Sequence, residues 1–363
     1  MLYVFVRSGE VWTQQADLQC PQFGSFQYFG YSVALEGDTA LVGTLAAPGL
    51  NVGGQVFFFA RSGPPGDEFW TSQQVFPSDG VPGDQFGVSV AMSPSQDTAV
   101  VGAYLEDNAG ELDAGSAYVF VKSGNSWVEQ AKLTASDGAA DDRFGLRVAI
   151  SGDTVLVGAY QDDHAGGANA GSAYVFTRSG TVWTEQAKLT ASDAAAGDGF
   201  GVSLAFSGDT AVIGAYTDDE AGGVDAGSAY VFTRSGDPEV WTEQSKLTAS
   251  DGAAEDWFGL AVALDADTPV IGARQDDNDG GIDAGSAYVF DLGCGAACCT
   301  GDFDGDNAVT EADIPGLTAA LLDAAGCPEP PECCPGDMNA DGMVDGDDIR
   351  GFVAKLFSGG ACP

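Results

Sequence analysis

Two acidic segments near the C-terminal end of the chain could hold metal ions. They are DFDGDNAVTEAD, residues 302–313, and DMNADGMVDGDD, residues 337–348. Each places oxygen-bearing side chains at positions 1, 3, 5 and 12: Asp302, Asp304, Asp306 and Asp313, then Asp337, Asn339, Asp341 and Asp348. Position 7, which is Ala308 or Met343, can add a backbone carbonyl. Because Ca²⁺ takes about six to eight oxygen ligands from such alternating loop positions, the spacing predicts two calcium sites.

A helical pattern follows each acidic segment. After residue 348, apolar residues recur at the spacing of one helix face: Ile349, Phe352, Val353, Leu356 and Phe357. The pattern after residue 313 is weaker and consists of Ile314, Leu317, Leu321 and Leu322. The alternative interpretation, two acidic surface turns, requires neither the matching offsets nor the helices that follow.

Paired calcium loops with Asp at the last position, each followed by a helix, resemble a type I dockerin. The resemblance covers about residues 300–363. It implies that residues 301–363 form a small α-helical, EF-hand-like domain with the loop positions named above as ligands of two Ca²⁺ ions. It also implies that the helices dock onto a cohesin-like partner.

Cysteine is concentrated in the same part of the chain. Cys20 stands alone, whereas seven cysteines lie near the C-terminal end: Cys294, Cys298, Cys299, Cys327, Cys333, Cys334 and Cys362. This density predicts a disulfide framework and an oxidising compartment, with residues 293–300 as a cysteine-containing linker. Zinc is the alternative, but the cysteine spacing fits no paired C-x2-C pattern.

Acidic residues also recur in two sets of loops upstream. One set contains Asp79 and Asp84, Asp137, Asp141 and Asp142, Asp193 and Asp198, and Asp251 and Asp256. The other contains Asp107, Asp162 and Asp163, Asp218 and Asp219, and Asp276 and Asp277. These carboxylates could form a ring that binds cations or a basic partner. Alternatively they are turn formers that bond to their own backbone.

Catalysis by these carboxylates is not favoured. A glycosidase needs two carboxylates in unlike environments, whereas these recur in near-identical contexts. The single histidine, His164, falls where the sister segments have Asn108, Glu220 and Asn278, so it is interpreted as surface variation. A Ser-His-Asp triad therefore has little support, and the chain is expected not to be an enzyme.

The acidic loops belong to a repeat. The dipeptide Phe-Gly recurs at intervals of 56 to 58 residues, beginning at Phe29, Phe86, Phe144, Phe200 and Phe258. Each unit holds short apolar, β-branched and aromatic runs bounded by Gly, Asp or Ser, and each run has strand length. The pattern predicts an all-β propeller of four-stranded antiparallel sheets over residues 1–292, with five blades favoured and six as the alternative.

The two ends of the repeat region look complementary. The last unit stops after GSAYVF at Phe290, and VWTQQADL near the N-terminus matches the strand that this unit lacks. We therefore expect the N-terminal strand to complete the last blade, although a spare YVF also precedes it. Tryptophans at one phase of the repeat are expected to be packing residues and not copies of a ligand site: Trp12, Trp70, Trp127, Trp183 and Trp241.

The segments FGVSVA from Phe86 and VVGAY from Val100, with the recurring GSAYVFTRSG, resemble the FG-GAP repeat. This is the blade unit of integrin alpha-chain heads and of many bacterial secreted proteins. The resemblance implies a propeller that displays loops for binding a protein or carbohydrate ligand.

Charge restricts the function further. The formal net charge is −41, with only 13 Lys and Arg, so the surface would repel nucleic acid and anionic membranes. No apolar run is long enough for a membrane span. The N-terminus lacks signal-peptide features and looks like a repeat cut in half, so we expect Met1 not to be the natural start.

Together these features predict an extracellular or cell-surface binding or adhesion protein whose calcium-dependent tail mediates attachment. The alternatives are a structural spacer and a polysaccharide-degrading enzyme on a propeller.

Overall fold

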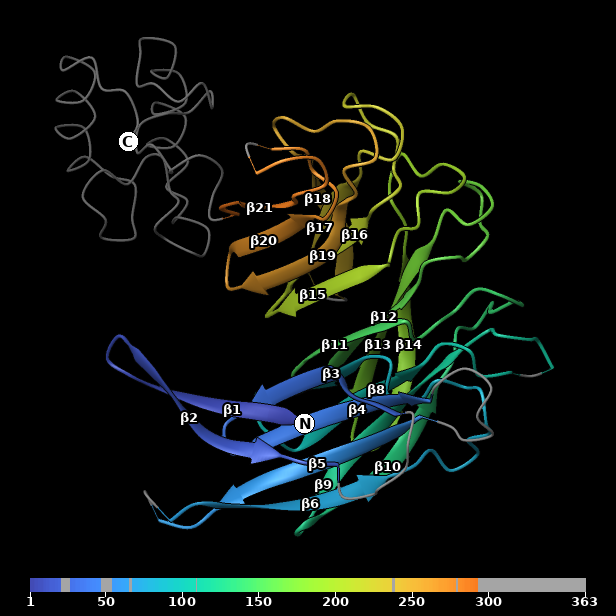
Figure 1. Cartoon of the computed structure of the whole chain (residues 1–363). Coiled ribbons are helices and arrows are strands. Elements are labelled where there is room, and N and C mark those ends of the chain that lie inside the picture. Colours follow the sequence, from blue (N-terminus) through green and yellow to red (C-terminus); the bar gives the residue numbers. More distant parts are fainter. Residues whose placement is uncertain are drawn as a thin grey trace, which may run out of the picture. The chain divides into compact units, whose positions relative to one another are not determined.

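The computed structural model describes residues 1–20, 27–46, 54–64, 67–108, 110–236, 239–278 and 280–292. The chain divides into two compact units, Met1–Val289 and Phe290–Pro363. Within the described residues the first unit is built from β-strands without helices (Figure 1). The linker at 293–300, the domain at 301–363 and both predicted calcium loops lie outside the described residues, so these remain predictions.

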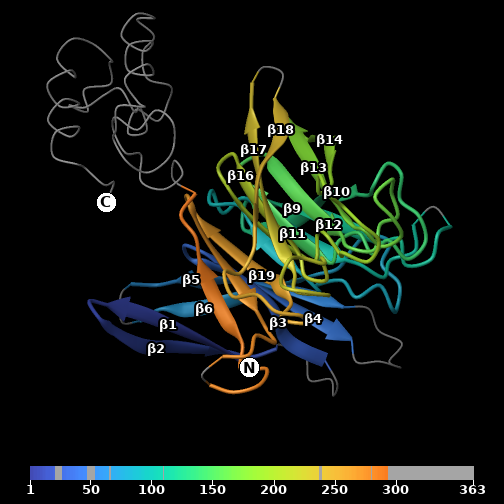
Figure 2. The same cartoon turned by 90° about the horizontal axis from the view of Figure 1, so that it is seen from above.

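Five sheets follow one another along the first unit and form five propeller blades, as the repeat predicted (Figures 1 and 2). Blade 1 contains β3 (Gln27–Glu36), β4 (Thr39–Ala46), β5 (Gln55–Ser62) and β6 (Phe69–Val75). Blade 2 contains β7 (Val90–Met92), β8 (Thr98–Ala103), β9 (Ser116–Ser123) and β10 (Ser126–Leu133). Blade 3 contains β11 (Arg147–Ser151), β12 (Thr154–Ala159), β13 (Ser172–Ser179) and β14 (Val182–Leu189).

The remaining strands complete the series. Blade 4 contains β15 (Ser203–Ser207), β16 (Thr210–Ala215), β17 (Ser228–Ser235) and β18 (Val240–Leu247). Blade 5 has three strands in the described residues, β19 (Phe258–Asp265), β20 (Thr268–Ala273) and β21 (Ser286–Val289). A two-stranded hairpin, β1 (Leu2–Ser8) and β2 (Val11–Leu18), precedes blade 1. Every ladder joins consecutive antiparallel strands, so each blade is a meander.

The core lies between blades because both faces of each inner blade are apolar. In blade 3, Val155 and Val157 pack towards blade 2, whereas Leu156 packs towards blade 4. This alternation follows from the period of two along a strand. A single blade would therefore expose both apolar faces to water, which explains why the chain repeats the unit.

From blade 2 onwards, each Phe-Gly dipeptide lies at the contact with the preceding blade. Phe144 is fully buried, with its ring edge-on to Tyr174 at 5.5 Å between centroids. The carbonyl of Gly201, from the next Phe-Gly, would lie 2.1 Å from a Cβ on Gly158 of β12. The glycines thus allow adjacent backbones to approach more closely than a side chain would permit.

The repeated tryptophans were expected to be packing residues, and those that follow a preceding blade pack between the two blades. Trp127 is buried and stacks on Phe58 of blade 1 at 4.1 Å between ring centroids. Trp183 packs in the core between blades 2 and 3. Trp12 in the hairpin has no such neighbour and is 63% exposed.

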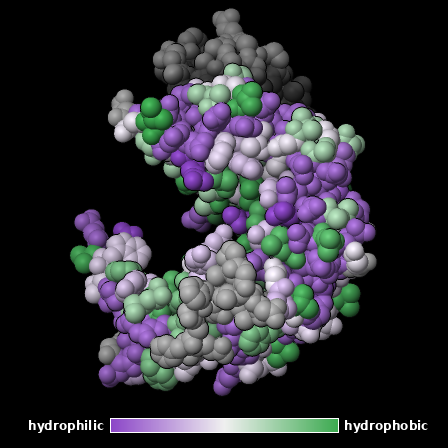
Figure 3. All heavy atoms as spheres, turned by 45° about the vertical axis from the view of Figure 1, so that its right-hand side comes forward, coloured by the Kyte–Doolittle hydropathy of each residue, from purple (hydrophilic) through white to green (hydrophobic). Residues whose placement is uncertain are grey.

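The expected completion of blade 5 by the N-terminal strand is wrong. β2 pairs with β1, and in the described part of the chain β21 pairs only with β20. The hairpin places Leu2 and Val4 against blade 1, where local pairing and apolar burial hold it. Apolar side chains are exposed at both ends of the series, including Phe5 and Val289. Figure 3 shows the surface of this unit hollowed on one side, with apolar residues in the wall.

Candidate functional site

Both acidic loops of a blade lie at one edge of its sheet. One loop joins the fourth strand of a blade to the first strand of the next, and the other joins the second and third strands of that next blade. For blade 3 these are residues 134–146 and 160–171. We call these paired loops of blades 2 to 5 the acidic rim.

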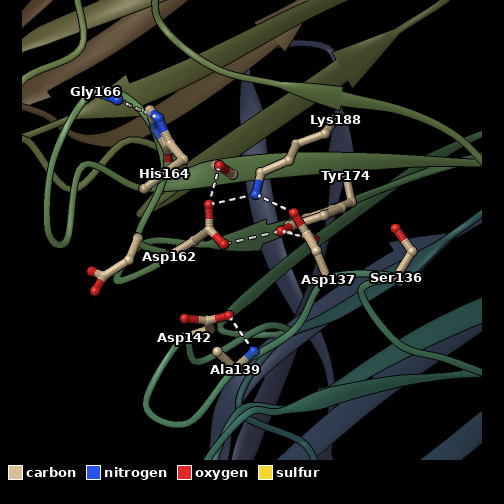
Figure 4. Close-up of polar contacts among 12 residues, drawn as sticks. Ser136, Asp137, Ala139, Asp142, Asp162, His164, Gly166, Tyr174 and Lys188 are labelled. Carbon is tan, nitrogen blue, oxygen red and sulfur yellow. Dashed lines mark hydrogen bonds and ion pairs between the residues drawn. The ribbon is translucent and has the colours of Figure 1, made fainter.

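A lysine holds the two loops of blade 3 together. The Nζ of Lys188, from β14, lies 2.7 Å from an oxygen of Asp137 in one loop and 2.8 Å from an oxygen of Asp162 in the other. The Oη of Tyr174 donates hydrogen bonds to both carboxylates, at 2.8 and 3.1 Å (Figure 4). Asp162 is almost fully buried, so the ammonium supplies the counter-charge that a buried carboxylate requires.

The same network recurs in the neighbouring blades. In blade 2 it consists of Lys132, Asp79, Glu106 and Tyr118, and in blade 4 of Lys246, Asp193, Asp218 and Tyr230. Burial by itself raises the pKa of Asp137, but hydrogen bonds from Lys188 and Tyr174 outweigh it and leave this pKa below its usual value. Burial and the adjacent carboxylates raise the pKa of Tyr174. At neutral pH Asp137 is therefore ionised and Tyr174 is neutral. Lys188 is charged, because burial, which lowers its pKa, is outweighed by its carboxylate partners, which raise it.

A second buried carboxylate closes the loop between blades. Asp142 is 3% exposed, and its Oδ2 accepts a hydrogen bond of 2.7 Å from the N–H of Ala139 (Figure 4). Asp84, Asp198 and Asp256 make the same contact three residues back. Burial, its largest cause, raises the pKa of Asp142 to about 6, and that of Asp198 likewise to about 6. These aspartates fix the conformation of a turn, and one occurs before each of blades 2 to 5.

The exposed aspartates of the second loop also have backbone partners. In each case the carboxylate accepts from the N–H six residues ahead. The pairs are Asp107 with Asp113, Asp163 with Asn169, Asp219 with Asp225 and Asp277 with Asp283. These bonds agree with the turn-forming interpretation of the acidic loops. Within the part of the chain that the structure describes, no three acidic, histidine or cysteine side chains converge on a metal position.

His164 is structural in this loop. Its Nδ1 accepts from the N–H of Gly166 at 2.9 Å, and its Nε2 lies 3.1 Å from the carbonyl oxygen of Gly171. A carbonyl only accepts, so the pair of contacts requires the neutral tautomer with the proton on Nε2. The interpretation of His164 as variation at a repeat position agrees with this geometry. Sequence reasoning missed that the ring bonds to the backbone at both nitrogens.

The rim of blade 4 forms an acidic hollow of about 300 Å³. Its charged lining residues are Asp193, Asp198, Asp218, Asp219, Glu220, Asp225 and Lys246. Lys246 is engaged with Asp193, Asp218 and Glu220, so one cation stands against six acidic side chains. A hollow of this charge suits a basic or cationic group.

Comparison with protein-family models matches the FG-GAP repeat over residues 12–59, 70–120, 127–176, 183–232 and 241–290. The second, third and fourth matches each begin in the fourth strand of one blade and end in the third strand of the next, whereas the first begins in β2 of the hairpin. No curated protein matches the chain. In the described residues, no helix has the length and apolar character needed to cross a membrane.

Proposed function

Since the chain belongs to the FG-GAP repeat family, whose propeller is a ligand-binding or adhesion-type fold, we propose that it is a non-enzymatic binding protein. The acidic rim recognises a protein or carbohydrate ligand through basic or cationic groups. FG-GAP repeats are typical of extracellular proteins, which supports a role at the cell surface or in a secreted assembly.

The observation that carries this proposal is the acidic hollow of blade 4. Six acidic side chains surround its single lysine, and Asp219 is exposed to solvent there. A ligand ammonium or guanidinium group would find carboxylate acceptors and a favourable field.

The repetition of the lysine network argues against catalysis at this rim. In blades 2, 3 and 4 the lysine of the fourth strand donates to the matching aspartate of the first loop, which is Asp79, Asp137 or Asp193. An acid–base pair for glycoside cleavage needs carboxylates in unlike environments at one place. The raised pKa of Asp142 recurs at Asp198, which supports a structural origin for it.

In this proposal the C-terminal segment, residues 301–363, attaches the protein to a partner. Asp302, Asp304, Asp306 and Asp313, with their counterparts at 337–348, would bind two Ca²⁺ ions and order the segment that follows. A cohesin-like domain is the partner class that the dockerin resemblance implies.

Binding at the rim can be tested with the full chain on a panel of basic proteins and of neutral and acidic polysaccharides. Asp219→Asn/Asp225→Asn removes two charges from the hollow and retains an acceptor at position 219. Asp265→Asn/Asp267→Asn removes two exposed charges from the β19–β20 turn instead. We expect at least one basic ligand to bind, to lose at least tenfold in affinity with the hollow variant, and to be unaffected by the turn variant. If no ligand of the panel binds, or if both variants lose affinity equally, ligand recognition by the acidic rim is contradicted. A structural spacer would then be the favoured function.

Calcium binding can be tested by calorimetric titration of the full chain. Wild type is expected to take up two equivalents of Ca²⁺, and Asp302→Ala/Asp337→Ala is expected to lose both. Calcium uptake that persists in the double variant would remove the predicted tail loops from the proposal.

A further inference from the structure

Within the residues that the structure describes, blade 5 ends in an unpaired strand edge. In blades 2, 3 and 4 the third strand pairs with a fourth: β9 with β10, β13 with β14, and β17 with β18. Among the described residues, the corresponding strand β21 pairs only with β20. Its outer backbone N–H and C=O groups are therefore available to a further strand.

Two carboxylates beside this edge lack the cation that their counterparts have. Tyr288 donates from Oη to Asp251 at 2.8 Å and to Asp276 at 3.4 Å, as Tyr174 does in blade 3. Asp276 is 3% exposed, yet no lysine or arginine in the described ranges forms an ion pair with it or with Asp251. In blades 2, 3 and 4 a lysine of the fourth strand bridges the equivalent carboxylates at 2.6 to 2.8 Å. A buried carboxylate without a counter-charge is unfavourable, so the site favours an incoming ammonium.

A serine next to these carboxylates also lacks its usual partner. Ser136 donates from its N–H and its Oγ, both at 2.8 Å, to the carboxylate of Glu185 in β14. Ser78 with Glu129 and Ser192 with Glu243 repeat this contact in the adjacent blades. Ser250 occupies the matching position before blade 5 and makes neither bond in the described part of the chain. A glutamate on a fourth strand would satisfy both donors.

The chain's own β2 has the wrong charges for this edge. Aligned on VWT, it carries Gln14 and Asp17 where β14 carries Glu185 and Lys188. Pairing with β21 would place Asp17 beside Asp251 and Asp276, and like charges at such distances repel. The described lysine-bearing strands β10, β14 and β18 are already paired in their own blades.

We propose that blade 5 binds an extended segment of a partner protein as its fourth strand. The segment runs antiparallel to β21 and carries a glutamate three residues before a lysine, followed directly by leucine. The register of blade 3, Tyr174 opposite Lys188 and Ala173 opposite Leu189, places the incoming lysine opposite Tyr288 and the leucine opposite Ala287. The lysine bridges Asp251 and Asp276, and the glutamate accepts from Ser250. This surface lies at a sheet edge and is independent of any ligand of the blade 4 hollow.

The probe is a fluorescent peptide, TVWTEQAKLT, with the sequence of residues 181–190, titrated with the full chain and followed by anisotropy. The matched control peptide is EVWTQQADLQ, residues 10–19, which has glutamine and aspartate at the two deciding positions. We expect the first peptide to bind at least tenfold more tightly than the second. Equal affinities, or no binding of the first peptide at about 1 mM chain, would overturn the proposal.

Variants of the chain locate the binding. Asp251→Asn/Asp276→Asn is expected to weaken the lysine peptide at least tenfold, because the amides keep the shape and remove the charge. Asp107→Asn/Asp163→Asn removes two charges from the rims of blades 2 and 3 and is expected to leave the affinity unchanged. Equal weakening by the two variants would show that net charge, not the edge of blade 5, attracts the peptide. If Asp251→Asn/Asp276→Asn fails to fold, the relative affinities of the two peptides for the wild-type chain still test the proposal.

Discussion

His164 does in blade 3 what Asn278 does in blade 5. The carbonyl oxygen of Asn278 accepts from the N–H of Gly280 at 2.7 Å, and its amide nitrogen donates to the carbonyl of Gly285 at 2.9 Å. Nδ1 and Nε2 of His164 meet the backbone at the matching positions, 166 and 171. Two chemically different side chains thus hold the same loop with the same donor and acceptor pattern.

His164→Asn is therefore expected to change the free energy of unfolding by less than about 0.5 kcal/mol. His164→Ala removes both contacts and is expected to cost about 1–2 kcal/mol. Urea unfolding of the three proteins at pH 7 measures the difference. If the asparagine variant is as unstable as the alanine variant, the imidazole has a role that an amide cannot provide.

The buried turn aspartates make stability depend on pH in an unusual direction. The pKa of Asp142 and of Asp198 is about 6 in the folded chain, because burial disfavours the charged carboxylate, and it is near its ordinary value when unfolded. The folded chain binds these protons more tightly. Their contribution to stability is therefore present below about pH 4 and is lost as the pH rises through about 6.

Asp142→Asn/Asp198→Asn retains an acceptor for the turn and cannot ionise. We expect this variant to melt at a higher temperature than wild type at pH 8, with the difference disappearing by about pH 4. Thermal melts across this range measure it, and Asp265→Asn/Asp267→Asn is the control for loss of two exposed charges. A constant difference at all pH values would mean that the two carboxylates do not titrate as described.

At the scale of elements, the strands were predictable because each carries its own signal. Alternating apolar residues and Gly-bounded turns recur five times. A strand whose pattern is weak in one unit can therefore be located by comparison with the other units. The pairing of β2 was not predictable from that signal, because its VWT start matches those of the fourth strands β14 and β18. Two residues distinguish β2 from β14: Gln14 and Asp17 replace Glu185 and Lys188. The importance of the second difference is clear only from the structure, in which Lys188 lies between two carboxylates.

The acidic loops show the same limit. The repeat predicted which acidic residues occupy these loops and that the loops share one side of the propeller. It did not predict which side chains the carboxylates bond to. Asp137 and Asp162 are far from Lys188 in the sequence, and the three meet only because the blade brings two loops and a strand together. The predicted calcium ligands, Asp302 to Asp348, lie outside the described residues, so they stay predictions.

The contact between blades gives an element-scale prediction. A Cβ on Gly158 would lie 2.1 Å from the carbonyl oxygen of Gly201, whereas a Cβ on Gly272 meets nothing closer than 3.8 Å. These glycines occupy the same strand position, in a blade that a further blade follows and in blade 5. Gly158→Ala is expected to cost about 2–4 kcal/mol in the free energy of unfolding, and Gly272→Ala less than about 1 kcal/mol. Similar losses in chemical denaturation would indicate that the close approach of blades does not explain the glycine.

At the scale of the whole molecule, charge and packing oppose each other. Apolar burial between successive blades holds the propeller together, whereas a formal net charge of −41 acts against the compact state. The lysine networks offset this repulsion only locally, since the chain has 13 lysines and arginines against 54 aspartates and glutamates. Dissolved salt should therefore contribute to the stability of the fold.

Raising NaCl from about 0.01 M to about 0.5 M shortens the screening length from about 30 Å to a few ångströms and weakens repulsion between exposed carboxylates. We expect the melting temperature of the full chain at pH 7 to rise by at least about 4 °C, or about 1–2 kcal/mol. Partly buried pairs such as Lys188 with Asp162 are screened less, so they oppose this rise only weakly. The control is the same titration at about pH 4, where many carboxylates are protonated and the rise should be smaller. Equal rises at both pH values would assign the effect to salt strengthening apolar burial, and repulsion would then not limit the stability of this acidic propeller.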